Sequence, residues 1–397
     1  MRVGVVGCGI GGMASAAILA QDGAEVTVFE RFSAPAPVGA GLLLQPSGLS
    51  TLARMDLIDH VISRGGPVFR VHGRTADGDT VLDLRYGEWR PEAFGLGIHR
   101  ATLFDALLLG MERADVELVC SCEITAIDQP ANPTLIAGDG RRFGPFDLVI
   151  LADGQSSALR TRLFPEAKAA LYPWGAVWTT RPDPEGRWRG GLAQTYRAGR
   201  EMMGVLPIGE APGTTGGRDN VAVFWSLRNE QITDWRKAGL NAWRDKARAL
   251  WPEAADLLDG VAHLEEMTHA VYRNVRARRW VHERVVMLGD AAHGTSPQLG
   301  QGANLALSDA AVLGDALDDC SSPDAALALW QEMRRPYVTW TQAMSALLTP
   351  AFQSDGWFAP GLRDLALGPL SRAPIAGKLM LNTLVGAARL PSLALPR

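Results

Sequence analysis

The sequence predicts an α/β protein in which a doubly wound parallel sheet carries an inserted antiparallel sheet and a C-terminal helical region. Residues 3–29 read as strand, glycine loop, helix and strand, which is the pattern of a βαβ unit. Residues 171–228 change to short strands divided by Gly and Pro, which is typical of an antiparallel sheet. Residues 285–317 return to a buried strand followed by a long helix.

The first βαβ unit lies at the start of the chain. Residues 3–6 are a short apolar run that predicts a buried strand, and residues 13–21 are small and apolar enough to form a closely packed helix. Gly23 is a stop signal for that helix. Residues 25–29 alternate with the period of a strand, so they predict the neighbouring strand of the sheet.

The loop of this unit is Gly7-Cys8-Gly9-Ile10-Gly11-Gly12, a G-x-G-x-x-G motif between strand and helix. Gly7 permits the tight turn, Gly9 lets a pyrophosphate approach the backbone, and Gly12 lets helix and strand pack closely. The pyrophosphate is expected at the helix N-terminus. Glu30 follows the second strand, where a carboxylate can accept from ribose hydroxyls. The motif predicts a dinucleotide and does not separate FAD from NAD.

Further strands are expected at residues 116–126 and 146–152. The alternation in residues 116–124 places the sulfurs of Cys120 and Cys122 on the core face of a strand. A metal pair is the alternative, but no second Cys/His pair at zinc spacing follows. We therefore expect reduced thiols.

A second glycine-rich turn follows residues 285–288. An acid at the end of a buried strand, Asp290, can bind the sugar-alcohol chain of a flavin, and Gly300-Gln301-Gly302 leads into a helix whose N–H groups can point at the flavin ring. The alternative is that Asp290 only caps the following turn. His293 suits a catalytic base or a packed loop histidine equally well, and no catalytic role is assigned to it.

Together these motifs resemble the group A, p-hydroxybenzoate hydroxylase-like family of FAD-dependent monooxygenases. Asp153-Gly154, after the strand at 146–152, is similar to the family's DG motif, which implies a role for Asp153 in binding FAD and NAD(P)H; from the residues alone an ordinary turn is equally open. Residues 39–41 with Gln45 resemble the segment that passes beside the flavin. Arg100 resembles a family arginine that reaches the cofactor. From the residues alone, the alternative is that Arg100 is a solvated residue at the surface.

The resemblance implies a Rossmann-like FAD-binding domain (residues 1–75, 98–165 and 270–328), an inserted antiparallel-sheet substrate domain (76–97 and 166–269) and a C-terminal helical tail (329–397). Residues expected to bind non-covalent FAD are Gly7, Gly9, Gly12, Glu30, Arg31, Gln45, Arg100, Asp153, Asp290, Gly300, Gly302, Ala303 and Asn304. The loop expected to face the flavin contains Pro297, Gly300, Gln301 and Gly302, and no catalytic or metal-binding residue is assigned. Candidate substrate-pocket residues are Trp178, Gln194, Tyr196, Phe224 and Trp225, although aromatic residues in strands often belong to the core.

The implied reaction is a hydroxylation. NAD(P)H reduces the flavin transiently, O2 adds at C4a, and the flavin C4a-hydroperoxide delivers one oxygen to a small aromatic or heteroaromatic substrate. No second G-x-G-x-x-G and no C-x-x-C is present, which argues against two-Rossmann monooxygenases and disulfide reductases. An epoxidase, a reductase or a non-redox flavoprotein of the same fold remains open, as does a flavin-holding protein without turnover.

The amino-acid composition restricts the classes of partner that the protein is expected to bind. The 397 residues are 47% hydrophobic and 21% charged, with a formal net charge of −4 and a pI near 6.0. This balance gives no reason to expect nucleic acid or an anionic membrane as a partner. The basic stretch at residues 273–284 is either a solvated face or a landing site for an anionic substrate or cofactor phosphates. We expect a cytoplasmic monomer or homodimer without a membrane span, whose C-terminal tail caps the pocket, forms a dimer contact or completes the core.

Overall fold

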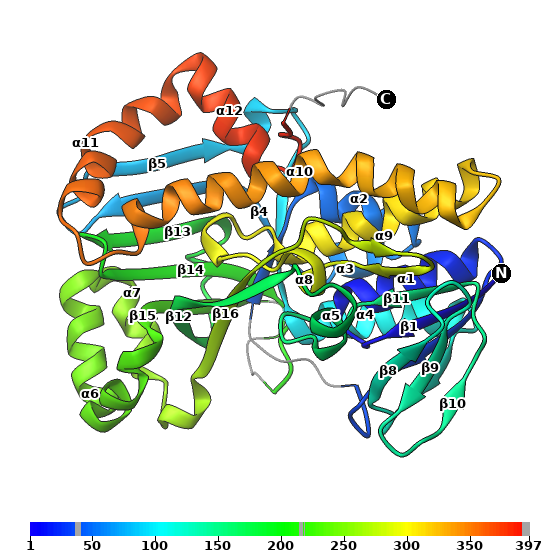
Figure 1. Cartoon of the computed structure of the whole chain (residues 1–397). Helices are drawn as coiled ribbons and strands as arrows, with labels where there is room; N and C mark the ends of the chain where they lie inside the picture. The colour runs from blue at the N-terminus through cyan, green and yellow to red at the C-terminus, as the bar shows by residue number, and fades with distance from the viewer. Residues whose placement is uncertain (36–40, 214–216, 218, 391–397) are drawn as a thin grey trace.

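A computed structural model describes residues 1–35, 41–213, 217 and 219–390. It contains a six-stranded sheet, a small three-stranded sheet and a nine-stranded sheet, with the C-terminal helices across the top in Figure 1. The predicted segment at residues 39–40 and the end of the tail lie outside the described residues. The chain is therefore an α/β protein with the layers that the sequence predicts.

The six-stranded sheet has the order β17-β18-β11-β1-β2-β7 and is parallel except for its edge strand β17. Apart from Arg2 at the start of β1, its central strands β1 and β11 are buried, as expected where helices cover both faces of a parallel sheet. The strands are β1 (Arg2–Val6), β2 (Glu25–Phe29), β7 (Glu117–Val119), β11 (Leu148–Leu151), β17 (Val281–His282) and β18 (Val285–Met287). The helices associated with this half are α1 (Ile10–Gln21), α2 (Pro46–Arg54), α3 (Ile58–Ile62), α4 (Arg100–Arg113), α5 (Ala158–Leu163), α8 (Asp290–His293) and α9 (Gly302–Asp319).

The predicted single strand at residues 116–126 is wrong in its extent. The chain forms β7, then turns at Ser121, which has φ of +50°, and continues as β8 (Ile124–Asp128) in the three-stranded sheet with β9 (Thr134–Ala137) and β10 (Arg142–Phe143). Cys122 is buried, but Cys120 lies in the turn and is partly exposed. The turn interrupts the alternation, because Ser121 donates its N–H to the Phe32 carbonyl (2.8 Å) instead of continuing a strand ladder.

The nine-stranded sheet has the order β16-β12-β15-β14-β13-β4-β6-β3, with β5 paired to β4. Neighbouring strands are antiparallel except for β13 and β4, which run parallel. One face is covered by α6 (Ile232–Leu250) and α7 (Pro252–Asp259), whereas the C-terminal helices pack on the other, which also faces the six-stranded half. The strands are β3 (Gly41–Leu44), β4 (Gly66–Thr75), β5 (Thr80–Arg85), β6 (Gly95–His99), β12 (Lys168–Pro182), β13 (Gly190–Arg197), β14 (Glu201–Gly209), β15 (Asn220–Arg228) and β16 (Thr268–Arg276).

The C-terminal region is helical, as predicted. The sequence indicates helix from Trp330, and in the structure the helix begins at Pro323. Helix α10 (Pro323–Phe352) runs across the molecule, and α11 (Phe358–Arg372) and α12 (Pro374–Leu384) fold back as a hairpin over β5. Leu381 and Val385 enter the core with Leu43 of β3, so this end of the tail completes the core. Across the described residues, no helix combines the length and the apolar character that crossing a membrane requires.

Candidate active site

The turn between β1 and α1 has the geometry that a bound pyrophosphate requires. Gly7 has φ of +104°, and a Cβ there would lie 2.6 Å from the Ala152 carbonyl oxygen, so only glycine fits. A Cβ on Gly12 would lie 2.0 Å from the Gly7 carbonyl oxygen, because the helix packs directly on the turn. A Cβ on Gly9 would meet no atom within 4 Å. The Gly9 carbonyl accepts the first helical hydrogen bond (2.9 Å), so the N–H groups at the start of α1 precede the ladder and can receive an anion.

Glu30 lies beside this turn, at the end of β2. One carboxylate oxygen accepts from the Cys8 N–H and the other from the Phe32 N–H, both at 3.0 Å. The side chain is buried, and the two backbone donors fix its orientation. Arg31 is exposed and its guanidinium stacks on the Phe32 ring, 4.6 Å from the centroid. Glu30 is therefore preorganised to accept hydroxyl groups beside the glycine turn, whereas Arg31 lies at its rim.

The second turn places Asp290 next to the start of α9. Asp290 is exposed, and a Cβ on Gly302 would lie 3.8 Å from its Oδ1 atom. The first hydrogen bond of α9 runs from the Leu305 N–H to the Gln301 carbonyl (2.8 Å), so the N–H groups of residues 302–304 precede the helical ladder. An acid and the positive end of a helix dipole therefore lie side by side. Pro297 begins a short 3-10 turn (Pro297–Leu299) before Gly300.

The two turns meet at the same edge of the parallel sheet. Helices α1 and α9 lie side by side in Figure 1. A Cβ on Gly11 would lie 2.7 Å from Leu288 Cδ1 and 3.4 Å from Ala306 Cβ. One end of α1 thus touches both the end of the strand before Asp290 and the first turns of α9, although these segments are far apart in the sequence. A ligand that extends from Gly9 can therefore reach the Asp290 turn.

Asn304 joins the Gln45 segment to this site. Its Oδ1 accepts from the Gln45 N–H (2.8 Å), and its Nδ2 donates to the carbonyls of Leu43 (3.0 Å) and Gly300 (3.1 Å). The Asn304 side chain is thus occupied by protein contacts, and only its backbone N–H remains for a ligand. Gln45 is buried; its Oε1 accepts from the Tyr86 hydroxyl (2.7 Å), while its Nε2 has no partner among the described residues. A buried donor without a partner fits a site completed by a polar ligand.

Asp153 lies where the sequence places it, after β11. Burial raises the pKa of its carboxyl, and a hydrogen bond from Ser157 and the charges of Arg160 and Arg31 oppose the rise. Its Oδ1 is buried with no partner in the described part of the chain. Arg160 is itself buried and donates to the carbonyls of Ala291 and Gln155, both at 3.0 Å. The Asp153 loop is therefore anchored to the Asp290 turn through Arg160.

Arg100, at the start of α4, is exposed and lies near a tyrosine that the sequence did not single out. The charges of Arg100 and Asp290 both act on Tyr272 of β16. Burial raises the pKa of Tyr272, and a hydrogen bond with Trp178 opposes the rise. The strand period could have identified Tyr272, because it shares a face with Thr268, which is in register with Trp178.

The candidate substrate residues separate onto the two faces of the nine-stranded sheet. Trp178 and Phe224 are opposite each other in register and stack with centroids 4.5 Å apart. Gln194 lies on the same face, opposite Gly204, over which the Phe224 ring lies. Trp225 points the other way and packs edge-on against Trp243 of α6 (6.5 Å). These observations favour Trp178, Phe224 and Gln194 for the pocket and place Trp225 in the core.

Tyr196 also packs as a core residue. Its ring lies 5.3 Å from that of Phe352 and 4.8 Å from the guanidinium of Arg363. The side chain is buried beneath the C-terminal helices. The structure does not bring it together with Trp178.

His293 belongs to a buried ionic cluster. Its Nε2 donates to Asp309 Oδ2 (2.5 Å), and Arg334 donates to Asp309 Oδ1 (2.7 Å). Asp309 also accepts from the Gly289 N–H (2.9 Å), directly before Asp290. Burial opposes ionisation of Asp309, but the charges of His293 and Arg334 outweigh it and lower its pKa to about 2. The cluster holds the second turn in place, which agrees with the packed interpretation of His293.

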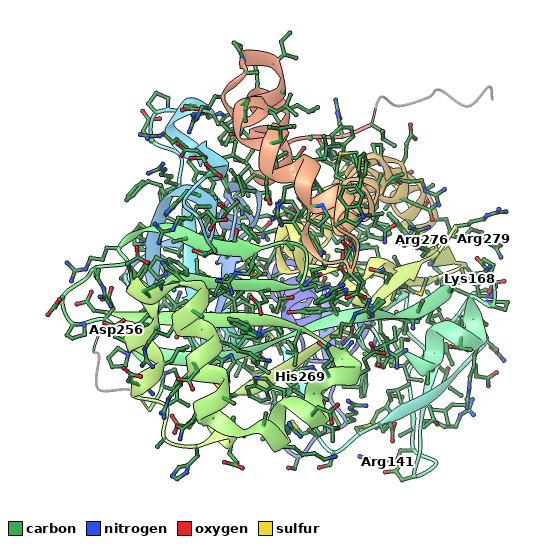
Figure 2. The ribbon with its side chains drawn as sticks, turned by 90° about the vertical axis from the view of Figure 1, so that its left-hand side faces the viewer. Arg141, Lys168, Asp256, His269, Arg276 and Arg279 are labelled. Carbon is green, nitrogen blue, oxygen red and sulfur yellow. The ribbon has the colours of Figure 1, made fainter. Side chains whose placement is uncertain are left out.

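The basic stretch at residues 273–284 lies largely at the surface. Arg276 is in register with Lys168, and Figure 2 shows both at the same edge as Arg279. Arg279 pairs with Glu166 (3.3 Å), and Arg284 pairs with Asp324 (2.9 Å). Exposed pairs of this kind contribute little to stability. The role of this stretch in anion binding stays a prediction.

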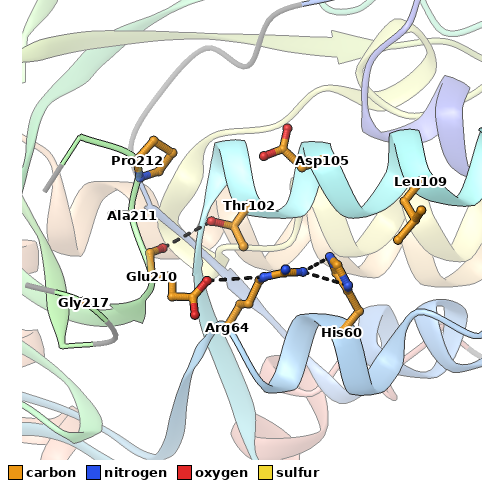
Figure 3. Close-up of a pocket in the computed structure, with 9 residues that line it drawn as sticks. All are labelled: His60, Arg64, Thr102, Asp105, Leu109, Glu210, Ala211, Pro212 and Gly217. Atoms are coloured by element: carbon orange, nitrogen blue, oxygen red, sulfur yellow. Dashed lines mark hydrogen bonds and ion pairs between the residues drawn. The ribbon is translucent and has the colours of Figure 1, made fainter.

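A surface pocket of about 560 Å³ opens between α3, α4 and the loop after β14 (Figure 3). Its cation Arg64 forms an ion pair with Glu210 (3.3 Å) and a hydrogen bond with His60 (2.7 Å). Burial and the charge of Arg64 lower the pKa of His60. None of the predicted site residues lines this pocket, so it is separate from the two glycine turns.

Two glycines of the first turn give a matched test. Gly9→Ala is expected to keep the melting temperature and lose more than about tenfold in FAD affinity, because its Cβ occupies the open space that a pyrophosphate needs. Gly12→Ala overlaps backbone, so it should lower the stability by about 1–3 kcal/mol as well. Gly361→Ala, also with open space around its Cβ, is the control. Flavin absorbance and thermal unfolding measure both effects, and equal FAD content in the three variants would contradict the assignment.

The chain is similar to known proteins over most of its length. The family model described as FAD binding domain matches residues 1–340. The 3-amino-4-hydroxybenzoate 2-monooxygenase of Streptomyces cremeus is 30% identical over 85% of this chain and 84% of its own. The 6-hydroxynicotinate 3-monooxygenase of Pseudomonas fluorescens is 24% identical over 87% and 90%. HpxO of Klebsiella pneumoniae, whose crystal structure is complexed with FAD and uric acid, is similar in fold: TM-score 0.82, 21% identity, 97% of each chain.

Proposed function

Since the chain belongs to the FAD-binding-domain family of p-hydroxybenzoate hydroxylase-like, FAD-dependent monooxygenases, we propose that it hydroxylates a small aromatic or heteroaromatic substrate with NAD(P)H and O2. The names of the relatives support this substrate class, because one acts on an aminohydroxybenzoate and another on a hydroxynicotinate. The observation that carries the proposal is the meeting of two glycine-rich turns at one sheet edge.

The described residues fit FAD. Gly9 would receive the pyrophosphate and Glu30 the ribose hydroxyls, since the first faces open space and the second is held beside it. Asp290 would bind the sugar-alcohol chain. The buried Gln45 Nε2 and Asp153 Oδ1 would find their missing partners on the cofactor or on water around it.

When bound, FAD supplies the redox chemistry, taking a hydride from NAD(P)H and activating O2. The protein supplies electrostatics and shape. The N–H groups of residues 302–304 and the dipole of α9 stabilise negative charge placed before them. Trp178 and Phe224 present an apolar wall from the facing sheet, which excludes water and gives a flat ring a stacking surface. The Tyr272 hydroxyl, which is hydrogen-bonded with Trp178 of that wall, can orient a polar substituent.

The organisation of the chain is part of the proposal. We place the domain boundaries at residues 75, 97, 165, 269 and 328, as the family resemblance implies. Two strands cross this division: β4 and β16 are assigned wholly or mostly to the FAD-binding domain, but both form hydrogen bonds within the nine-stranded sheet. The four cysteines are free, which fits a cytoplasmic protein. The substrate and O2 are the partners, and a monomer or homodimer is the expected assembly.

Turnover with candidate substrates tests the proposal. The purified protein should be yellow, and phenolic or heteroaromatic acids should stimulate both NAD(P)H oxidation and O2 uptake while one oxygen atom enters the product. Labelled O2 with mass spectrometry of the product gives the direct readout. Bleaching of the flavin without substrate-linked O2 uptake would identify a reductase instead, and colour without NAD(P)H oxidation would identify a flavin-holding protein.

A further inference from the structure

Helix α11 exposes its large apolar residues and buries small or charged ones, which is the opposite of the arrangement expected for a surface helix. Its buried positions are small or charged: Pro360, Arg363, Gly368 and Ser371. Gly368 packs against β5, where a Cβ would lie 2.2 Å from the Thr80 carbonyl oxygen. A surface helix normally buries its large apolar residues and exposes its polar ones. The outer face of α11 therefore needs its own explanation.

That outer face is apolar and continues onto α12. Phe358, Leu362 and Leu365 follow helical spacing on the exposed side of α11, and Leu365 is 78% exposed. Trp357, directly before them, is 82% exposed, and Ile375 at the start of α12 is 88% exposed. The hairpin projects from the top of the molecule in both overall views (Figures 1 and 2). Contiguous exposed apolar surface of this kind marks an interaction site.

The charges on the hairpin are basic. Its exposed charged side chains are Arg372 and Lys378, and neither forms an ion pair with a described carboxylate. Asp364 is paired with the buried Arg363 at 2.6 Å. In sequence, residues 356–397 contain five basic residues and one acidic residue, in a chain whose net charge is −4. The net charge of the whole chain gave no reason to expect an anionic membrane as a partner. This C-terminal segment, however, is basic as well as apolar.

From this combination we infer that the outer face of α11 and α12 docks on an anionic lipid surface. The apolar side chains would enter the boundary between headgroups and acyl chains, with Trp357 and Phe358 at the interfacial depth that aromatic residues prefer. Arg372 and Lys378 would contact the lipid phosphates. A second copy of this chain fits less well, because a two-fold axis through the face would bring its like charges together. Docking of this kind needs no spanning helix.

The docking face is connected to the candidate active site. The end of α12 accepts a hydrogen bond from Gln301 Nε2 at the Leu384 carbonyl (2.5 Å). Gln301 lies directly before the start of α9, in the loop expected to face the flavin. A single helix therefore runs from the exposed Ile375 to that loop, so the docking face and the candidate active site are joined by one element.

Vesicle co-sedimentation of the holoenzyme tests the inference. Wild-type protein should bind vesicles of equal parts phosphatidylglycerol and phosphatidylcholine at least about tenfold more tightly than pure phosphatidylcholine, and added salt should weaken the binding. Leu365→Glu with Ile375→Glu, and separately Arg372→Glu with Lys378→Glu, should each reduce binding about tenfold or more. FAD content and melting temperature should stay at wild-type values, because all four side chains are exposed.

Two controls match these variants elsewhere on the surface. Leu171→Glu replaces an exposed leucine of β12, and Lys246→Glu replaces an exposed lysine of α6; neither should change vesicle binding. Equal binding of the wild type to both kinds of vesicle, or to neither, would overturn the inference without reference to any variant. A dimer in sedimentation velocity that Leu365→Glu with Ile375→Glu dissociates, in protein that ignores vesicles, would assign the face to a second copy instead.

Discussion

Asp290→Ala is expected to purify largely without flavin and to bind added FAD about 10- to 100-fold more weakly than the wild type. Its carboxylate lies exposed beside the start of α9, where it can accept from hydroxyl groups of the sugar-alcohol chain. A hydrogen bond to a charged group contributes about 1.5–3 kcal/mol, which corresponds to this range of affinity. The fold itself should survive, because no described side chain depends on this carboxylate for a hydrogen bond. Titration of the apoprotein with FAD, followed by flavin fluorescence, measures the loss.

Two control variants show whether the FAD affinity depends on the charge of the Asp290 side chain and on its place in the structure. Asp290→Asn keeps an acceptor of the same shape, so it should lose less affinity than the alanine variant. Asp234→Ala removes an exposed aspartate from α6, far from both glycine turns in sequence, and should bind FAD normally. Wild-type affinity in Asp290→Ala would leave the capping role as the better explanation of this residue and would remove one end of the proposed cofactor site.

The local features of the site could be predicted from sequence because each depends on few residues. Gly7, Gly9 and Gly12 have distinct steric requirements that follow from the motif alone, and the structure shows the predicted turn, open space and close contact. Strand period and glycine placement also identified the second turn and the helix that follows it. The meeting of the two turns came from the family resemblance and not from spacing.

The features that sequence reasoning missed depend on tertiary neighbours. Trp225 and Phe224 are adjacent in the chain and equally aromatic, yet one faces α6 and the other faces Trp178, because the period of a strand gives two faces without saying which is the core. Asn304 is predicted to bind the cofactor, and its backbone N–H stays available for that role; what the sequence did not indicate is that its side-chain amide joins β3 to the loop before α9. Asp309 carries no local motif, and its importance appears only when Gly289, His293 and Arg334 converge on it.

Asp309→Ala is expected to have the largest effect on stability. The side chain is fully buried and accepts hydrogen bonds from His293, Arg334 and the Gly289 N–H. Removing the carboxylate leaves the Arg334 charge buried without a counter-ion, a change that costs about 3–5 kcal/mol. The melting temperature should fall by about 4–6 °C. FAD affinity should fall too, since the Gly289 N–H that anchors the Asp290 turn loses its acceptor. Asp319→Ala, at an exposed position near the end of the same helix, should change neither quantity.

The pH dependence distinguishes an ionic role of Asp309 from simple packing. Its folded-state pKa of about 2 is below the ordinary value of 3.8, because the native state favours the charged form. The resulting stabilisation is fully present above the ordinary pKa and is lost as the pH falls from about 4 towards 2. Asp309→Asn, which preserves volume but not charge, should therefore be less stable than the wild type by a constant amount near neutrality, and the difference should shrink across that acidic range. Urea unfolding of both apoproteins at several pH values measures this difference. A difference independent of pH would mean that packing around Asp309, and not its charge, holds the second glycine turn.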